Sequence, residues 1–300
     1  MDFGVTAGAR SNMPAAEVDI DEDLVRSLIR DQRPHLVGEE LTPLAFCWDN
    51  VSYRIGESRV ARFPRREMAV QLIVNEATWL PELAPALPLA IPAPEYLGVP
   101  AQGYPWPWVI SPFLRGETAA TAHLDPLTGA RQLGEFLKAL HRPAPADAPD
   151  NRFRGGPLST RAEGVEDRLG MITDAADRSR LADLWEESLH APPHDGAPVW
   201  LHGDLHPLNL LVEDGTLTAV IDFGDITAGD PATDLVVGWN LLGDGLEELW
   251  RAYGAEDEPL RLRARGWAIA LGLAFADTSA DHPVIREIGE KTLRAVLDNT

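Results

Sequence analysis

Cysteine is nearly absent from this chain of 300 residues, which contains Cys47 alone. A single cysteine excludes an intrachain disulfide, and a cytoplasmic location is therefore the expectation. Long apolar runs are also missing, because the most continuous one, residues 267–276, is too short to span a bilayer. The chain does not open with a basic segment followed by an apolar run, so neither a secretory signal nor a membrane partner is predicted.

Positive charge is scarce, with 26 Lys and Arg residues against 47 Asp and Glu residues and a formal net charge of −21. This excess disfavours nucleic acid as a partner and would attract a cationic ligand. Residues 1–115 carry 10 basic and 15 acidic side chains, whereas residues 116–300 carry 16 and 32. Ligand binding and a general bias toward solubility explain that difference equally well. The length exceeds that of a usual single domain and predicts two lobes.

One stretch, residues 200–234, places two acids and an amide at a spacing typical of phosphoryl transfer. Asp204 lies in the tetrad His-Gly-Asp-Leu, Asn209 follows five positions later, and the triplet Asp-Phe-Gly begins at Asp222. The order matches the protein-kinase signature H-R-D-L-x-x-x-N followed by D-F-G. Phosphoryl transfer requires a positioned hydroxyl and metal ions that neutralise phosphate charge. Asp204 is the predicted catalytic residue, because a carboxylate can accept a proton from the hydroxyl or orient it. Since Mg²⁺ prefers oxygen ligands, Asn209 and Asp222 are the predicted metal ligands.

The flanking pattern predicts a β-hairpin that carries both metal-ligand candidates. Residues 208–212 and 217–221 are apolar runs, and Glu-Asp-Gly at 213–215 is turn chemistry between them. Asn209 would then lie at the start of one strand and Asp222 just past the end of the other. Both side chains could therefore face one cleft.

The sequences HGDLHPLNLL and VIDFGD resemble the aminoglycoside phosphotransferase family of antibiotic kinases, which is distantly similar to protein kinases. The resemblance implies an α+β, two-lobed, protein-kinase-like fold with a small β-rich N-terminal lobe and a larger helical C-terminal lobe. It implies a nucleotide-binding lobe over 1–110, a hinge over 111–115, and a lobe with the catalytic loop and acceptor pocket over 116–300. The implied donor is ATP or GTP with Mg²⁺. The implied acceptor is a small molecule, an aminoglycoside or a macrolide, and the acidic second lobe favours a cationic one. A monomer or weak dimer is expected.

The predicted small lobe departs from the protein-kinase pattern at its phosphate contacts. Residues 51–55 and 59–63 are predicted strands around a Gly-Glu-Ser turn, but the loop G-x-G-x-x-G is absent. Asn50 and Ser52 are therefore the candidates for phosphate contacts in that hairpin. The lobe contains no lysine, so the cation expected on the second strand falls on Arg62. The motif V-x-R-x-P-R-R is similar to the macrolide-kinase branch of the family, and arginine can bind phosphate through its planar fork.

The same resemblance supplies the rest of the nucleotide site. Glu76, on a predicted helix over 67–83, would pair with the strand arginine and hold it toward the phosphates. An exposed arginine and a solvent-facing glutamate are the alternatives. Residues 106–113 are predicted to form an apolar strand that leads into the connection between the lobes. In the family that connection offers main-chain groups to the purine, which makes Ser111 and Phe113 the remaining candidates.

Outside these segments the chain is predicted to be mainly helical, with a proline-rich loop at 81–100. Aspartates at helix starts and apolar residues at helical spacing define the predicted helices. They cover residues 20–32, 125–141, parts of 160–190, 231–242, 246–253, 259–278 and 283–297.

Other interpretations of the site stay open. The pattern H-x-D-x-H at 202–206 could suggest a zinc hydrolase, although zinc sites need three protein ligands and no second His-rich cluster exists. A nucleotide-binding pseudokinase that acts as a sensor or scaffold would share the fold, and the missing glycine-rich loop favours it. A metabolic small-alcohol kinase would share every motif. A protein kinase is less favoured, because Gly203 replaces the signature arginine and no A-P-E element follows.

Overall fold

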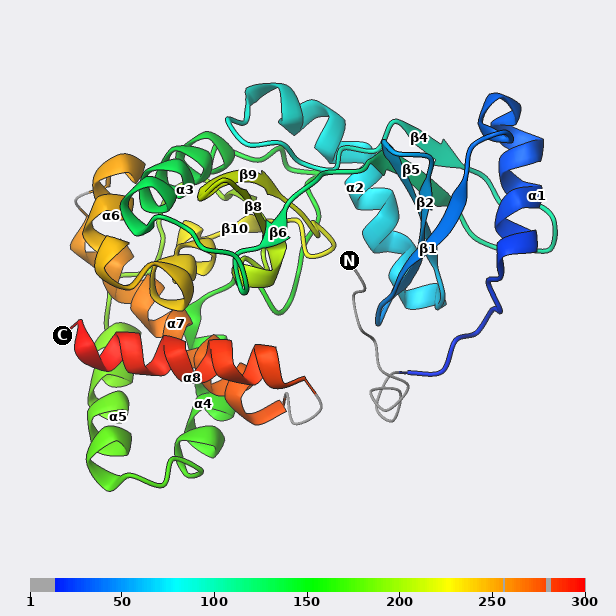
Figure 1. The fold of residues 1–300 in the computed structure, drawn as a ribbon. Helices are drawn as coiled ribbons and strands as arrows, with labels where there is room; N and C mark the ends of the chain where they lie inside the picture. Colours follow the sequence, from blue (N-terminus) through cyan, green and yellow to red (C-terminus); the bar gives the residue numbers. More distant parts are fainter. Residues whose placement is uncertain (1–13, 256, 279–281, 300) are drawn as a thin grey trace. The chain divides into compact units, whose positions relative to one another are not determined.

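The computed structural model describes residues 14–255, 257–278 and 282–299 (Figure 1). The chain divides into two compact units, one of residues 1–85 with 91–115, the other of residues 86–90 with 116–300. The short segment 86–90 joins the second unit because Ala90 pairs with a strand there. Its N–H donates to the Thr218 carbonyl at 3.2 Å, and its carbonyl accepts from the Val220 N–H at 2.9 Å. The predicted hinge over 111–115 lies at the end of the first unit.

The first unit contains a five-stranded antiparallel sheet in the order β1-β2-β3-β5-β4. Alternating side chains and a turn at Gly56, where φ is +56°, explain the β2–β3 hairpin predicted from sequence. The strands are β1 (Leu41–Phe46), β2 (Asn50–Ile55), β3 (Arg59–Pro64), β4 (Tyr96–Gly98) and β5 (Trp108–Pro112).

Two helices accompany this sheet, α1 (Glu22–Gln32) and α2 (Val70–Leu83). Asp21 caps α1 by accepting the Leu24 N–H at 2.8 Å, as its position in the sequence predicts. The prediction of a loop from residue 81 is wrong at its start, because Pro81 lies inside the last turn of α2. The buried Leu83 follows it, and we attribute the continuation to that burial, which offsets the hydrogen bond that proline cannot donate. Short 3₁₀ turns cover Pro34–Leu36, Glu67–Ala69 and Ala84–Ala86.

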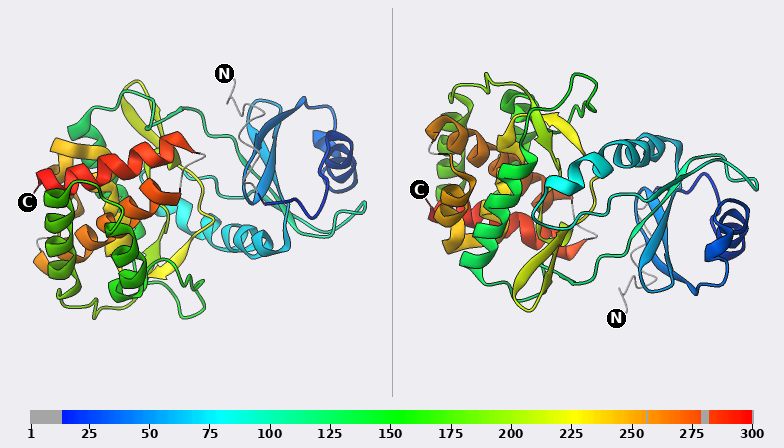
Figure 2. Two further views of the ribbon diagram at one scale, coloured as in Figure 1. Left: turned by 90° about the horizontal axis from the view of Figure 1, so that it is seen from below. Right: turned by 90° about the horizontal axis from the view of Figure 1, so that it is seen from above.

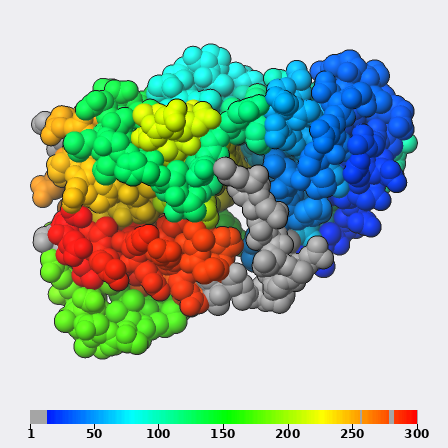
Figure 3. All heavy atoms as spheres, viewed as in Figure 1, coloured from blue at the N-terminus to red at the C-terminus, as the bar shows by residue number. Residues whose placement is uncertain are grey.

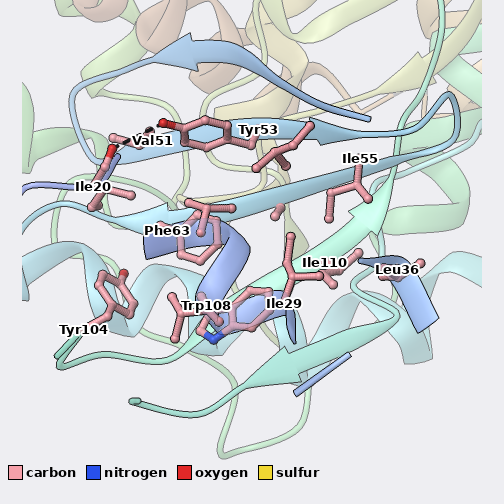
Figure 4. Close-up of a cluster of buried hydrophobic side chains, with 14 residues drawn as sticks. Ile20, Ile29, Leu36, Val51, Tyr53, Ile55, Phe63, Tyr104, Trp108 and Ile110 are labelled. Atoms are coloured by element: carbon pink, nitrogen blue, oxygen red, sulfur yellow. Dashed lines mark hydrogen bonds between the residues drawn. The ribbon is translucent and has the colours of Figure 1, made fainter. Parts of the chain in front are cut away.

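The core of the first unit fixes which way β3 faces. Phe63 stacks on Trp108 with ring centroids 5.0 Å apart, and Tyr104 meets Phe63 edge-on at 5.7 Å (Figure 4). Ile29 of α1 belongs to the same buried cluster. Because side chains alternate along a strand, a buried Phe63 directs its neighbour Arg62 to the opposite face of the sheet.

The second unit carries two small antiparallel sheets. One has the order β6-β8-β9, and the other pairs β7 with β10. The predicted hairpin is confirmed, with its strand ends shifted by one or two residues. The strands are β6 (Glu117–Thr118), β7 (Val199–Leu201), β8 (Leu210–Glu213), β9 (Thr216–Val220) and β10 (Thr227–Gly229).

Most of the second unit is helical, and α7 and α8 pack side by side in it (Figures 1 and 2). In the space-filling view α8 forms a band across the surface of this unit (Figure 3). No helix among the described residues combines the length and apolarity needed to cross a membrane. The α-helices are α3 (Pro126–Leu140), α4 (Ala162–Leu169), α5 (Ala175–Leu189), α6 (Leu246–Tyr253), α7 (Glu258–Thr278) and α8 (Pro283–Asp298).

The segment after β10 differs from the helix predicted over 231–242. It winds as a 3₁₀ helix at Pro231–Val236 and as a π-helix at Gly238–Leu242. The Asp230 side chain caps its start by accepting the Ala232 N–H at 3.0 Å. The residues of this segment hold the catalytic loop, as described below. Further 3₁₀ turns cover Leu158–Arg161, Pro207–Asn209 and Gly243–Gly245.

Candidate active site

The loop between β7 and β8 carries the predicted catalytic residue and begins with a sharp turn at Gly203. Its φ is +88°, and an added Cβ would lie 2.3 Å from the Asp225 carbonyl oxygen. Both features exclude a side chain at this position without displacement of the backbone. The departure from the protein-kinase arginine at this position therefore has a local cause, since only glycine fits here.

Asp234 is completely buried and binds the backbone of this turn. Its carboxylate accepts the backbone N–H of His202 at 2.7 Å and that of Gly203 at 2.9 Å. His141 Nε2 lies 3.3 Å from the same carboxylate, and the other ring nitrogen of His141 lies 2.9 Å from the Tyr253 hydroxyl. Burial alone would raise the pKa of Asp234, but the hydrogen bond and charge of His141 outweigh it and lower the pKa. A charged, immobile carboxylate therefore fixes the start of the loop.

The Asp204 carboxylate is held at both oxygens. Arg154 Nη2 donates to Oδ1 at 2.9 Å, and His206 Nε2 lies 3.4 Å from Oδ2. Burial by itself would raise the pKa of Asp204, yet the hydrogen bond from His206 and the charges of His206, Arg154 and His202 bring it well below its usual range. The side chain is 28% exposed, so a ligand can still reach it. Such a weak base is suited to orienting a hydroxyl group rather than to storing its proton.

Asn209 and Asp222 are linked through the backbone. The Asn209 side-chain nitrogen donates to the Asp204 carbonyl at 2.9 Å, and the Ile221 N–H donates to the Asn209 carbonyl at 2.9 Å. His202 Nε2 in turn lies 2.9 Å from the Ile221 carbonyl. Asp222 therefore follows directly after a residue that is bonded to both the catalytic loop and Asn209.

These two side chains fit a magnesium site. Because the Asn209 amide nitrogen donates inside the loop, the amide oxygen is the atom of this side chain that could bind a metal. Asp222 is exposed and has a positive φ of +63°, a strained conformation for a residue other than glycine. One amide oxygen and one carboxylate suit Mg²⁺, which keeps waters and phosphates in its other positions. The zinc interpretation gains no support, since no group of three or more possible metal ligands occurs in the described residues.

In the first unit Arg62 and Glu76 form a bidentate ion pair that is largely buried. Arg62 Nη1 donates to Glu76 Oε1 at 3.1 Å, and Nη2 bonds to Oε2. The Glu76 side chain is 1% exposed and the Arg62 side chain 15%. The alternatives of an exposed arginine and a solvent-facing glutamate are therefore wrong. The role of the pair toward phosphate stays a prediction.

The other nucleotide-site candidates differ in whether their polar groups already have hydrogen-bond partners. Ser52 on β2 and Ser111 on β5 are both buried. The buried Ser111 hydroxyl and the buried Asn50 amide oxygen have no hydrogen-bond partner among the described residues. Their role toward nucleotide stays a prediction. The Phe113 N–H, by contrast, already donates to the Ser58 carbonyl at 2.8 Å and is not available to a purine.

The sequence profile of the phosphotransferase enzyme family, APH, matches residues 40–267. The chain belongs to this family. The predicted resemblance is therefore confirmed, and the kinase-type enzymes of the family are its relatives. A comparison with curated protein sequences finds no match.

Solved structures of APH-type enzymes share the fold. The GDP and kanamycin complex of APH(2'')-IIIa has a TM-score of 0.69 and 22% identity, and covers 92% of this chain and 99% of its own. Macrolide 2'-phosphotransferase MphH from Brachybacterium faecium has a TM-score of 0.58 and 23% identity, and covers 91% and 98%. A type I macrolide 2'-phosphotransferase has a TM-score of 0.62 and 18% identity, and covers 93% and 99%. The predicted fold class, a β-rich N-terminal and a helical C-terminal region of APH type, is confirmed.

The ion pair of Arg62 on β3 and Glu76 on α2 gives a first testable prediction. Replacing Glu76 with alanine leaves the Arg62 guanidinium without its counter-charge, and we expect a loss of about 3–5 kcal/mol in the free energy of unfolding. Nucleotide affinity should fall as well, because Arg62 is no longer held in place. Urea denaturation and calorimetric titration with Mg²⁺-nucleotide measure the two effects. Glu67→Ala, at an exposed position before the same helix, is the control and should change stability by less than about 0.5 kcal/mol. An equal effect of both variants would contradict the prediction.

Sequence reasoning missed three residues that touch the catalytic loop or the segment after it. Arg154 binds Asp204, Asn151 donates to the Asp225 carboxylate at 2.7 Å, and Asn240 donates to the Leu205 carbonyl at 3.2 Å. Asn240 lies in the π-helix, and such turns occur often at functional sites. No periodic signal marks any of the three, because each acts through a contact distant in sequence.

Proposed function

We propose that this protein is an O-phosphotransferase that moves the γ-phosphate of Mg²⁺-bound ATP or GTP to a hydroxyl of a small molecule, an aminoglycoside or macrolide antibiotic. The observation that carries the proposal is the bonded unit formed by the catalytic loop and the Asp-Phe-Gly segment. In it the Asp204 carbonyl binds the Asn209 amide, and Asn209 binds the residue before Asp222. Three polar residues of the required kinds thus lie on two segments of the second unit that are bonded to each other.

Each residue has a role that its contacts support. Asp204, ionised and held at both oxygens, orients the acceptor hydroxyl. Asn209 and Asp222 hold the metal through oxygen, and bound magnesium neutralises charge on the phosphates. Arg62, fixed by Glu76, binds phosphate oxygens through its guanidinium fork.

The relatives support the donor and acceptor classes. Structures of this type were solved with GDP and kanamycin, with streptomycin and ATP, and with ADP. The net charge of −21 favours a cationic acceptor. The pseudokinase alternative is less favoured, because Asp204, Asn209 and Asp222 are all present, with Asn209 bonded to Asp204 and to Ile221, the residue before Asp222. A metabolic alcohol kinase would use the same residues and differs only in its acceptor.

The decisive experiment is a transfer assay with purified protein, Mg²⁺ and either ATP or GTP. An aminoglycoside, a macrolide and a sugar panel serve as acceptors, and mass spectrometry detects the phosphorylated product. We expect nucleoside diphosphate and a monophosphorylated acceptor in equal amounts, and no product without Mg²⁺. Nucleotide binding without transfer to any acceptor would favour the pseudokinase, and transfer to sugars alone would favour the metabolic kinase.

A further inference from the structure

Arg154 contacts the proposed catalytic carboxylate from a segment with no kinase signature. Besides the bond from Nη2 to Asp204, its Nη1 lies 3.4 Å from the Phe153 carbonyl. Its Nε is buried and has no hydrogen-bond partner among the described residues. The guanidinium is therefore not saturated by protein contacts, although its side chain is only 15% exposed. A purely structural arginine would be expected to use more of its donors.

The backbone on both sides of Arg154 is fixed tightly enough to place the side chain. The Gly155 N–H donates to the Thr233 hydroxyl at 3.2 Å, and the Gly155 carbonyl accepts the Asp230 N–H at 2.9 Å. Gly155 has a φ of +72°, and an added Cβ on Gly229 would lie 2.3 Å from its carbonyl oxygen. Two glycines thus allow the loop to approach β10 closely.

A second anchor lies on the N-terminal side of the same loop. The Pro149 carbonyl accepts from the Thr227 hydroxyl at 2.9 Å and from the Ala228 N–H at 3.2 Å. Asn151 donates to the Asp225 carboxylate at 2.7 Å. The loop is therefore attached before and after Arg154 to β10 and to the residues on either side of that strand.

The positive charge of Arg154 lowers the pKa of two acids, Asp204 and Asp225. Burial raises the pKa of Asp225; Arg154 opposes this increase, and the negative charge of Asp204 adds to it. Without the guanidinium, the Asp204 carboxylate would keep a neighbouring like charge and lose its donor at Oδ1. It would then be held at Oδ2 alone, by His206, and would be less firmly oriented.

We infer that Arg154 is a positioning residue for the proposed reaction, which holds the Asp204 carboxylate in the orientation that the acceptor hydroxyl meets. The inference rests on the proposed function. We expect Arg154 to affect the reaction step and not nucleotide binding, because it contacts neither Asn209 nor Asp222 in any described interaction.

The test compares Arg154→Met, which keeps the apolar stem, with Arg154→Lys, which keeps the charge. Arg152→Met is the matched control, because Arg152 is an exposed arginine of the same loop that stacks on Phe153. We expect Arg154→Met to lower kcat by about 10- to 100-fold with an unchanged KM for nucleotide, because a carboxylate displaced by about 1 Å costs rate of that order. Arg154→Lys should recover part of the loss, and Arg152→Met should match the wild type.

Other outcomes overturn the inference. An unchanged or higher kcat in Arg154→Met shows that the contact is dispensable or inhibitory. A joint loss of nucleotide affinity and melting temperature that lysine does not recover shows a structural role instead.

A measurement without turnover separates this inference from the proposed function. Slow rotation of the Arg154 guanidinium, read from separate Nη signals by NMR, is expected in the wild type and should be lost in Asp204→Ala, which removes the accepting oxygen. Free rotation in the wild type overturns the inference, whatever the activity. Absence of transfer to every acceptor contradicts the proposed function, and slow rotation that depends on Asp204 then still supports the positioning contact.

Discussion

Asp204→Asn is expected to lower turnover by about a thousandfold while nucleotide affinity stays within about twofold of the wild type. Asparagine has the shape of aspartate and keeps an oxygen that can accept from Arg154, so the loop should retain its conformation. What is lost is the negative charge that orients the acceptor hydroxyl in the proposed function. The Asp204 contact to Asn209 uses the backbone carbonyl and persists in the variant, which leaves the proposed metal ligand Asn209 in place.

The measurement combines steady-state kinetics with calorimetric titration of Mg²⁺-nucleotide. Asp222→Asn is the contrasting variant, because its loss should weaken Mg²⁺-dependent nucleotide binding directly. Glu213→Gln, an exposed acid at the end of β8, controls for a general change of charge. Undiminished turnover in Asp204→Asn would remove this residue from its assigned role.

The parts of the site that could be predicted are those whose signals are local. Asp204, Asn209 and Asp222 fall within a short stretch, and the alternation of the hairpin between them sets their spacing. The β2–β3 hairpin followed from the same kind of pattern. The pairing of Arg62 with Glu76 came from the family resemblance, because neither a strand arginine nor a helical glutamate shows its partner in its own sequence.

The parts that could not be predicted depend on contacts between distant segments. Arg154 lies 50 positions before Asp204, in a loop without periodicity, and His141 lies 93 positions before Asp234. A histidine at the end of a helix, as His141 is, gives no sign in the sequence of a buried carboxylate partner. Pro81 was predicted to open a loop, because proline disfavours helix, and the burial around it is a tertiary effect.

Asp234→Ala is expected to cost about 3–5 kcal/mol of the free energy of unfolding, because it removes one member of a buried charged cluster and leaves its partners unpaired. The N–H groups of His202 and Gly203 would lose their acceptor, and His141 would lose its carboxylate. Since the folded-state pKa of Asp234 lies below its unfolded value, this contribution is complete at neutral pH and is lost as the pH falls through the folded-state pKa. Urea denaturation at pH 7 measures it.

Turnover should fall in the same variant even where most of it remains folded, because the start of the catalytic loop is no longer held and Asp204 follows directly after it. Asp234→Asn keeps one acceptor oxygen and should lie between alanine and the wild type in both stability and rate. Asp244→Ala, an exposed acid in the following 3₁₀ turn, should leave stability within about 0.5 kcal/mol. If Asp234→Ala behaves like Asp244→Ala, the catalytic loop takes its conformation from Gly203 and the β7–β10 pairing alone, and the buried carboxylate is not what positions Asp204.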